Sequence, residues 1–243
     1  MTATNVLTNP PVIEAIIDFV FQTELSASDF SKINSFFQSS AEKSEKFNGF
    51  EVKIQNKENE MPSVKKVNDG STRHFFSSSS FVVLVKLNGI TFSMLRPYRG
   101  FDYFSNLVKE ECGKLKLNEI CQIKRVGVRY VNVFIAPVKS EYVNEYLNFL
   151  PTWPSDIKTQ PTDFVSRVSL PLPDLLATCI LTQTSLPLAD GKSVQVAVDI
   201  DLFRIYASEL QLDSIWGDLV NLKAKLNQLF FRTISRKALD LFL

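Results

Sequence analysis

The chain has 243 residues, of which 45% are hydrophobic, 22% charged and 12% aromatic, and its formal net charge is +1. This is the composition of a globular protein. The near-zero charge excludes a protein whose overall field attracts nucleic acid or membrane surfaces. The length allows one large domain or two small ones, and we expect a single domain, residues 1–243.

Cysteine and histidine are too few and too scattered for a metal site. Cys112, Cys121 and Cys179 form no CxxC pair, and His74 is the only histidine. A structural zinc site needs four such ligands, so we expect reduced, buried thiols and no metal or other cofactor. The first ten residues lack the features of a signal peptide, and no apolar run approaches the roughly 20 residues of a membrane helix. We therefore expect a cytoplasmic protein without membrane contact.

In the first half of the chain, polar and apolar residues alternate in several segments. Apolar residues at every second position from Ile13 to Phe21 predict a half-buried strand, and Ser26 with Asp29 predicts a helix cap. Asn88-Gly89 predicts a type I′ hairpin turn, in which both residues need a positive φ. Other strands are expected at 50–54, 75–76, 81–87 and from 90 to 97, a helix from Asp102, and a long loop at 56–72.

The second half begins with a long strand at 123–135. A short helix at 143–150 and a loop at 151–161 are expected next, followed by strands at 164–170 and 175–181. Asp190-Gly191 predicts a hairpin turn before a strand at 194–202. Leucines at helical spacing predict a helix at 213–232, and the tail 235–243 is expected to add a last helical turn or two.

This order of elements predicts an α+β fold with a mostly antiparallel sheet and helices packed on one side. Each half follows the order strand, helix, about three strands, helix. This order is compatible with two β-α-β-β-β-α halves, 1–137 and 138–243, that share one core. We find no convincing sequence identity between the halves, so the repeat rests on element order alone.

The strand at 123–135 carries the first candidate site. Arg125 and Arg129 lie on one face with Gly127 between them, and a glycine in a strand lets another group approach the backbone closely. Arginine binds carboxylates and phosphates through two parallel hydrogen bonds. The pair could therefore form an anion site, could be solvated, or could pair with Glu14 and Asp18 on the polar face of the first strand.

Asp199 and Asp201 form a second candidate, because residues two apart in a strand share a face. Paired carboxylates can hold a divalent metal or transfer protons. They can equally form a polar outer face or pair with a neighbouring strand. No nucleophile elbow, phosphate-binding glycine loop or zinc-protease motif accompanies them, and nothing marks His74 as a general base, which argues against an enzyme of a familiar class.

Nucleic acid is a further candidate ligand. Lys65, Lys66 and Arg73 precede Phe75 and Phe76, and aromatic side chains on a sheet can stack bases. Acidic residues at 58, 60 and 69 dilute the basic cluster. A solvated loop beside a core strand explains the same residues.

Four short motifs carry a resemblance to a known family. They are Asn9-Pro10-Pro11 with Glu14, Phe92-Ser93 with Pro97-Tyr98, the segment Arg125-Val126-Gly127-Val128-Arg129-Tyr130-Val131-Asn132, and the closing stretch from Leu226 to Ser235. The chain resembles a sporadically distributed prokaryotic family of uncharacterised proteins with an N-P-P-x-x-E start, an R-x-G-x-R-Y-x-N strand and an amphipathic C-terminal helix.

The resemblance implies that Glu14, Arg125, Arg129, Tyr130 and Asn132 form an anion or ion-pair cluster, with Asp199 and Asp201 as a second acidic pair. The patchy distribution of the family implies an accessory protein of mobile or defence-type gene cassettes. We therefore expect a non-enzymatic protein that acts through protein–protein contacts or self-association. The alternatives are a nucleic-acid or nucleotide binder that uses Arg125 and Arg129, and a metal-dependent hydrolase that uses Asp199 and Asp201.

Overall fold

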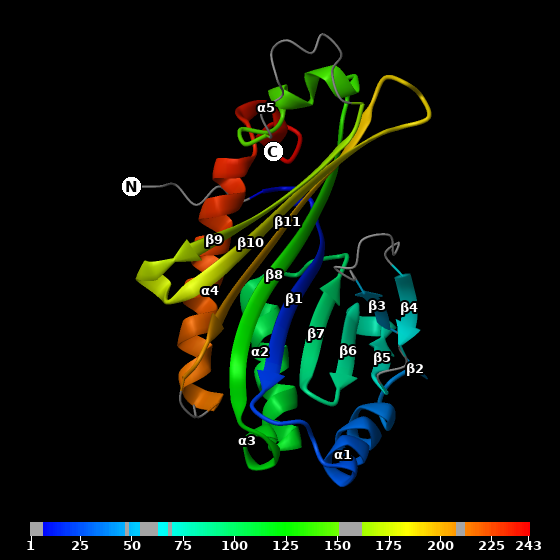
Figure 1. The fold of residues 1–243 in the computed structure, drawn as a ribbon, viewed down its shortest axis with the longest axis vertical. Coiled ribbons are helices and arrows are strands. Elements are labelled where there is room, and N and C mark those ends of the chain that lie inside the picture. Colours follow the sequence, from blue (N-terminus) through cyan, green and yellow to red (C-terminus); the bar gives the residue numbers. More distant parts are fainter. Residues whose placement is uncertain (1–6, 47–48, 54–62, 68–69, 151–161, 208–211) are drawn as a thin grey trace.

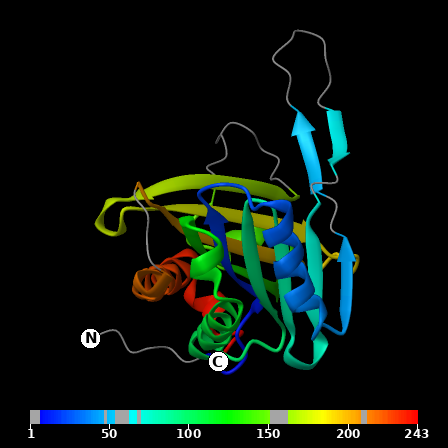
Figure 2. The ribbon, with the colours of Figure 1, turned by 90° about the horizontal axis from the view of Figure 1, so that it is seen from below.

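The computed structural model describes residues 7–46, 49–53, 63–67, 70–150, 162–207 and 212–243. In these residues the chain forms an α+β fold: a nine-stranded, fully antiparallel sheet with helices packed on one face (Figures 1 and 2). The expected fold class is confirmed. The order of strands across the sheet is β2-β5-β6-β7-β1-β8-β11-β10-β9, and β3 and β4 form a separate hairpin that projects from the edge at β2 and β5 (Figure 2).

The elements have the following bounds. The strands are β1 (Val12–Phe21), β2 (Lys43–Lys46), β3 (Gly49–Lys53), β4 (Ser63–Val67), β5 (Thr72–Phe76), β6 (Phe81–Lys86), β7 (Gly89–Leu95), β8 (Ile123–Ala136), β9 (Phe164–Leu172), β10 (Ala177–Pro187) and β11 (Val194–Ile205). The helices are α1 (Ala27–Gln38), α2 (Phe101–Leu115), α3 (Leu117–Ile120), α4 (Leu212–Thr233) and α5 (Arg236–Leu239), with short 3₁₀ turns η1 (Ser77–Ser79), η2 (Ser140–Glu145) and η3 (Pro173–Leu175).

The core lies between the sheet and the helices, and phenylalanine dominates it. Phe19 of β1 packs edge-on against Trp216 of α4, and Phe81 of β6 packs against Phe104 of α2. Phe37 of α1 contacts Phe92 of β7. Because successive side chains of a strand point to opposite faces, the alternate residues of each strand form a second, open face that no described helix covers.

The strand order repeats on either side of the central strands β1 and β8. β7, β6 and β5 follow β1 outward, and β11, β10 and β9 follow β8. The turns at equivalent places also have the same backbone. Phe76 (φ −121°, ψ 78°) and Ser80 (φ 54°, ψ 32°) flank η1, while Leu172 (φ −120°, ψ 79°) and Leu176 (φ 48°, ψ 40°) flank η3.

The register locates the axis of this pseudo-two-fold arrangement at Ile17 and Val128, which face each other. A row of paired residues across β6, β7, β1 and β8 corresponds to a row across β10, β11, β8 and β1. The first row is Phe81, Met94, Ala15 and Tyr130, and the second, in the same order, is Ala177, Arg204, Val126 and Phe19. In this correspondence β8 is the equivalent of β1. The predicted division into halves 1–137 and 138–243 instead counts β8 with the first half, and that division stays a prediction.

Several local expectations are confirmed. Ser26 caps α1, with its hydroxyl accepting a hydrogen bond from the Asp29 amide. Gly191 has a φ of +62° in the turn between β10 and β11. The C-terminal tail contains the short helix α5. All three cysteines are free; Cys112 and Cys179 are buried as expected, whereas Cys121 is only partly buried.

The turn predicted at Asn88-Gly89 is only half right. The hairpin forms, but β7 already begins at Gly89, and neither residue has a positive φ, so the turn is not type I′. Gly89 is instead needed for close packing, since a Cβ atom there would lie 2.5 Å from the Phe19 carbonyl oxygen. Part of the predicted loop 56–72 is strand β4, and the helix expected at 143–150 is the 3₁₀ turn η2 at 140–145. The predicted loop 151–161 lies outside the described residues.

No helix in the described ranges is both long enough and apolar enough to cross a membrane.

Candidate functional site

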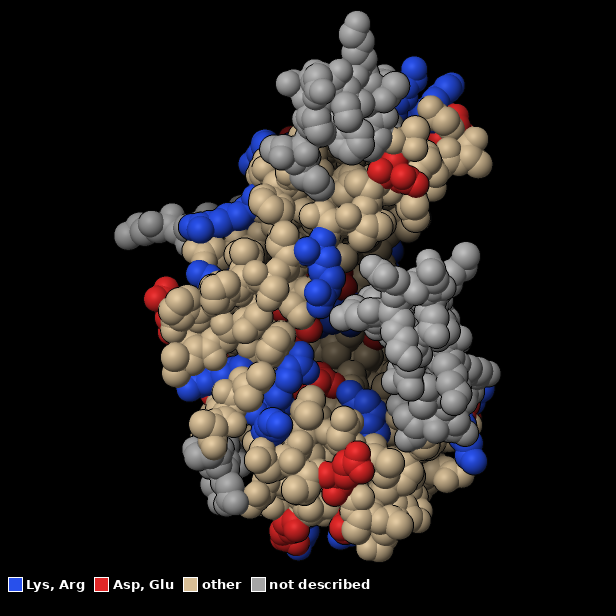
Figure 3. Space-filling model, in the orientation of Figure 1, with Lys and Arg blue, Asp and Glu red and all other residues tan. Residues whose placement is uncertain are grey.

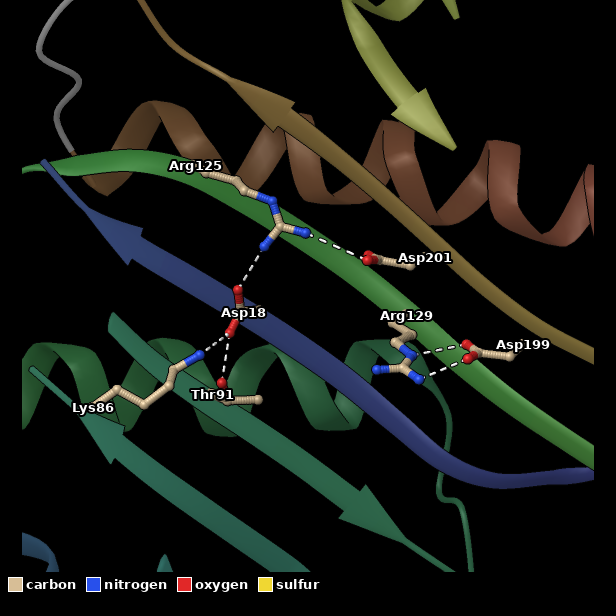
Figure 4. A network of polar contacts seen from close by, with 7 residues as sticks. All are labelled: Asp18, Lys86, Thr91, Arg125, Arg129, Asp199 and Asp201. Carbon is tan, nitrogen blue, oxygen red and sulfur yellow. Dashed lines mark hydrogen bonds and ion pairs between the residues drawn. The ribbon is translucent and has the colours of Figure 1, made fainter. Parts of the chain in front are cut away.

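The open face carries a network of charged side chains at the centre of the sheet (Figure 4). Asp18 of β1 lies at its middle. One carboxylate oxygen, Oδ1, accepts hydrogen bonds from Lys86 Nζ (2.9 Å) and Thr91 Oγ1 (2.5 Å), and Oδ2 accepts one from Arg125 Nη1 (2.8 Å). Asp18 therefore joins β6, β7, β1 and β8 through one side chain.

Arg125 extends from Asp18 toward Asp201 of β11, with 3.4 Å between Nη2 and Oδ2. Its guanidinium also lies over the ring of Phe203, 4.2 Å from the centroid. Gly127 lies beside this arrangement. A Cβ atom there would lie 3.6 Å from Arg125 Nη2 and 3.5 Å from Phe203 Cβ, which is ordinary van der Waals contact, so the arrangement does not require a glycine. The group that approaches the backbone at this glycine is thus the arginine of the same strand.

Arg129 forms the second part of the network. It donates two hydrogen bonds to Asp199, from Nε to Oδ1 (2.8 Å) and from Nη2 to Oδ2 (2.6 Å). In the register Arg129 lies opposite Asp201, and Asp199 lies opposite Val131, two residue pairs further along the same face, so the bidentate contact is diagonal across the strands. Arg129 is the most exposed member, with 45% of its side chain accessible, against 17–23% for the three aspartates.

The charges within the network balance. Lys86, Arg125 and Arg129 carry three positive charges, and Asp18, Asp199 and Asp201 carry three negative ones. The hydrogen bonds from Arg129 to Asp199 raise the pKa of Arg129. Burial raises the pKa of Asp201, and the nearby Arg125 and Arg129 partly offset that effect.

Glu14 lies on the same face but is not one of the ion-paired residues. Among the described residues it makes no ion pair, although its charge contributes to the raised pKa of Arg129. Of the ion pairs expected between the two arginines and Glu14 or Asp18, only the pair of Arg125 with Asp18 forms, and Arg129 pairs with Asp199 instead. The two candidates that the sequence presents separately, the arginines and the aspartates, are cross-strand neighbours in one network.

Tyr130 and Asn132 lie on the opposite, helix-covered face. The Tyr130 hydroxyl is hydrogen-bonded to the Tyr98 hydroxyl, and Asn132 Nδ2 donates to the Val198 carbonyl oxygen at 3.1 Å. Burial raises the pKa of Tyr98 to about 12 and that of Tyr130 well above its usual value. The five residues of the expected cluster therefore do not form one site, and Tyr130 and Asn132 belong to the core.

Two members of the network, Lys86 and Thr91, are not apparent from the sequence. Both belong to the β6–β7 hairpin, and only the pairing of β7 with β1 brings them to Asp18. The space-filling view shows basic and acidic side chains next to each other around a hollow near the middle of this face (Figure 3).

The aromatic residues considered for base stacking separate by face as well. Phe76 and Phe81 pack in the core against Phe37 and Phe104. Phe75 carries Lys43 and Arg73 over its ring, with centroid distances of 5.4 and 5.9 Å. Lys65 and Lys66 fall in β4, where only the backbone is described.

Metal ligands do not gather in the described part of the chain. No three His, Cys, Asp or Glu side chains there are placed to hold one ion. His74 is fully buried between Ser44 and Asn34, with ring-nitrogen contacts of 2.8 and 3.0 Å.

No family model matches the chain, and a search of curated proteins finds no significant match.

Proposed function

We propose that this chain is a non-enzymatic binding protein that receives a partner protein on the open face of its sheet. The observation that carries the proposal is the charge-balanced network around Arg129 and Asp199, which lies at the centre of a face that no described helix covers and leaves 45% of the Arg129 side chain accessible. The family resemblance favours a partner from the same defence-type gene cassette.

The balance of charges favours a protein over a nucleic acid. A protein surface presents both signs of charge and can interleave with alternating basic and acidic groups. A polyanion needs free cations, because its affinity comes from neutralising phosphates. Here Arg125 and Arg129 already bind carboxylates of the same chain, so a phosphate would have to displace them.

The nucleotide alternative keeps one argument in its favour. Figure 4 shows the remaining guanidinium nitrogen of Arg129 pointing away from Asp199, and 45% of this side chain is accessible to an external anion. The metal-dependent alternative is less favoured, because Asp199 and Asp201 each face an arginine that would compete with a cation.

The test is affinity purification of the tagged full chain from its native host, with mass spectrometry and absorbance at 260 nm on the eluate. Wild type is compared with the charge swap Arg129→Asp/Asp199→Arg and with Arg232→Ala, which removes an exposed arginine from α4. We expect a stoichiometric protein that wild type and Arg232→Ala retain and that the swap loses by at least about ten-fold.

Two outcomes would contradict the proposal. Nucleic acid or nucleotide that co-purifies with wild type and is lost in the swap would indicate a nucleic-acid or nucleotide binder that uses Arg125 and Arg129. Turnover of any substrate that disappears in Asp199→Ala would show an enzyme. Melting temperatures of all variants, compared with that of wild type, show whether a loss of the partner results from unfolding of the variant.

A further inference from the structure

The two edges of the sheet differ in how they are protected. Edge strands can pair with other chains unless charge, proline or short length prevents it. β2, at one edge, has four residues, three of them charged: Lys43, Glu45 and Lys46. β9, at the other edge, has nine residues and a single charge, Arg167.

The backbone N–H groups on the outer side of β9 meet no acceptor among the described residues. Pro171 lies opposite Thr178 in the ladder with β10, and proline is tolerated in an edge strand where its nitrogen faces away from the neighbouring strand. Alternation then turns the N–H groups of Val165, Arg167 and Ser169 outward as well. Among the described strands only β10 pairs with β9.

The side chains of β9 leave apolar surface at this edge. Leu170 is 38% exposed, while Cys179, its partner on β10, is almost fully buried, and Val165 on the open face is 73% exposed. Phe164, Val168 and Leu172 pack against the core but are only partly covered. A further strand beside β9 would cover this row.

We propose that β9 pairs antiparallel with β9 of a second copy of this chain, so that the two sheets continue into each other across a two-fold axis. Val168 is the middle residue of the strand. Pairing along the full strand places Val168 opposite Val168 of the second copy, and Phe164 opposite Leu172 of the second copy. Apolar residues therefore face each other on the helix-covered side.

Charge argues against one neighbouring register, the one centred on Arg167. With Val168 on the axis, Arg167 lies opposite Ser169 of the second copy, so the two arginines are not directly opposed. Centring the pair on Arg167 would place like charges opposite each other, which destabilises a strand pair. The β2 edge, with three charges in four residues, does not offer an equivalent pairing. This inference does not depend on the proposed function of the open face.

Sedimentation velocity of the full chain from about 1 to 100 µM tests self-association. We expect twice the mass of the 27.5 kDa chain. Ser169→Pro removes an outward N–H, and Val165→Lys adds charge to the edge, without touching the ladder to β10. Each should weaken the dimer at least about ten-fold, whereas Glu45→Lys at the β2 edge should leave it unchanged. A monomeric wild type, or a Ser169→Pro variant that dimerises like wild type, overturns the proposal.

A cysteine at position 168 tests the register. Residues in a non-hydrogen-bonded antiparallel pair have Cα atoms about 4.5 Å apart, which a disulfide can span. We expect Val168→Cys to form a cross-linked dimer on mild oxidation, whereas Leu170→Cys, which would face Ser166, should not. Cross-linking of Leu170→Cys but not Val168→Cys contradicts this pairing. Wild type, whose own thiols are buried or half-buried, is the control, and circular dichroism verifies that each variant is folded.

Discussion

At the scale of single residues, Asp18 and Glu14 show that two acidic side chains on the same face of one strand can differ in what they contribute to stability. Both are acidic residues of β1 on the open face, but Asp18 accepts three hydrogen bonds, two of them from the cations Lys86 and Arg125. Its side chain is 17% exposed. Removing its carboxylate leaves Lys86 without an ion-pair partner among the described residues and Arg125 with only its longer contact to Asp201, whereas Glu14 makes no ion pair there.

We expect Asp18→Ala to lower the free energy of unfolding by about 2–4 kcal/mol, somewhat less than a fully buried pair because the site is partly solvated. Glu14→Ala should change it by less than about 0.5 kcal/mol. Urea unfolding followed by circular dichroism measures both. Equal losses in the two variants would contradict the assignment of Asp18 as the centre of the network.

At the scale of elements, His74 of β5 connects its own strand to β2 and α1 at the β2 edge of the sheet. Asn34 Nδ2 donates to the Phe30 carbonyl oxygen, so its Oδ1 accepts from His74 Nε2 (3.0 Å), and Ser44 Oγ then donates to Nδ1 (2.8 Å). The neutral imidazole thus links β5 to α1 and β2. Burial lowers the pKa of His74 below its ordinary value of 6.5.

This arrangement predicts a loss of stability in mild acid. Because the folded pKa lies below the unfolded one, the unfolded chain binds a proton first as the pH falls through about 6.5, and stability drops until the folded pKa is reached. The slope for one proton is at most about 1.4 kcal/mol per pH unit. Thermal unfolding at pH 7.5 and 5.5 should show a larger decrease for wild type than for His74→Gln. An equal decrease would remove His74 as the cause.

At the scale of the whole molecule, the two sides of the pseudo-two-fold arrangement share one sheet and one core. β1 and β8 pair along nearly the whole length of β1, and Trp216 of α4 packs against Phe19 of β1 with ring centroids 6.1 Å apart. Neither side can lose its packing without exposing the core of the other.

We therefore expect a single unfolding transition, which the buried thiols can report. Cys112 lies in α2 and Cys179 in β10, one on each side of the central strands, and burial raises the pKa of both. In single-cysteine variants (Cys121→Ser/Cys179→Ser and Cys112→Ser/Cys121→Ser), both thiols should become reactive at the same urea concentration as the loss of circular dichroism. Earlier exposure of one thiol would show that the two sides unfold separately.

Features with a short sequence range were predictable. The alternation of β1, β8 and β11, the Ser26 cap and the leucine stripe of α4 follow from the fixed periods of strand and helix. The same alternation places Arg125 with Arg129, and Asp199 with Asp201, on common faces. The short polar strands β2 and β4 escaped prediction because their residues show no such pattern, and their pairing comes from neighbouring strands.

The sequence by itself therefore determined the fold class, the faces of the long strands and the charged residues that share them, because side-chain direction along a strand is set by local covalent geometry. Only the tertiary structure decided which carboxylate meets which arginine. Strand order and register depend on how the whole chain buries its phenylalanines between sheet and helices. That burial placed β8 between β1 and β11, and so brought Asp18, Arg125, Arg129, Asp199 and Asp201 into one network.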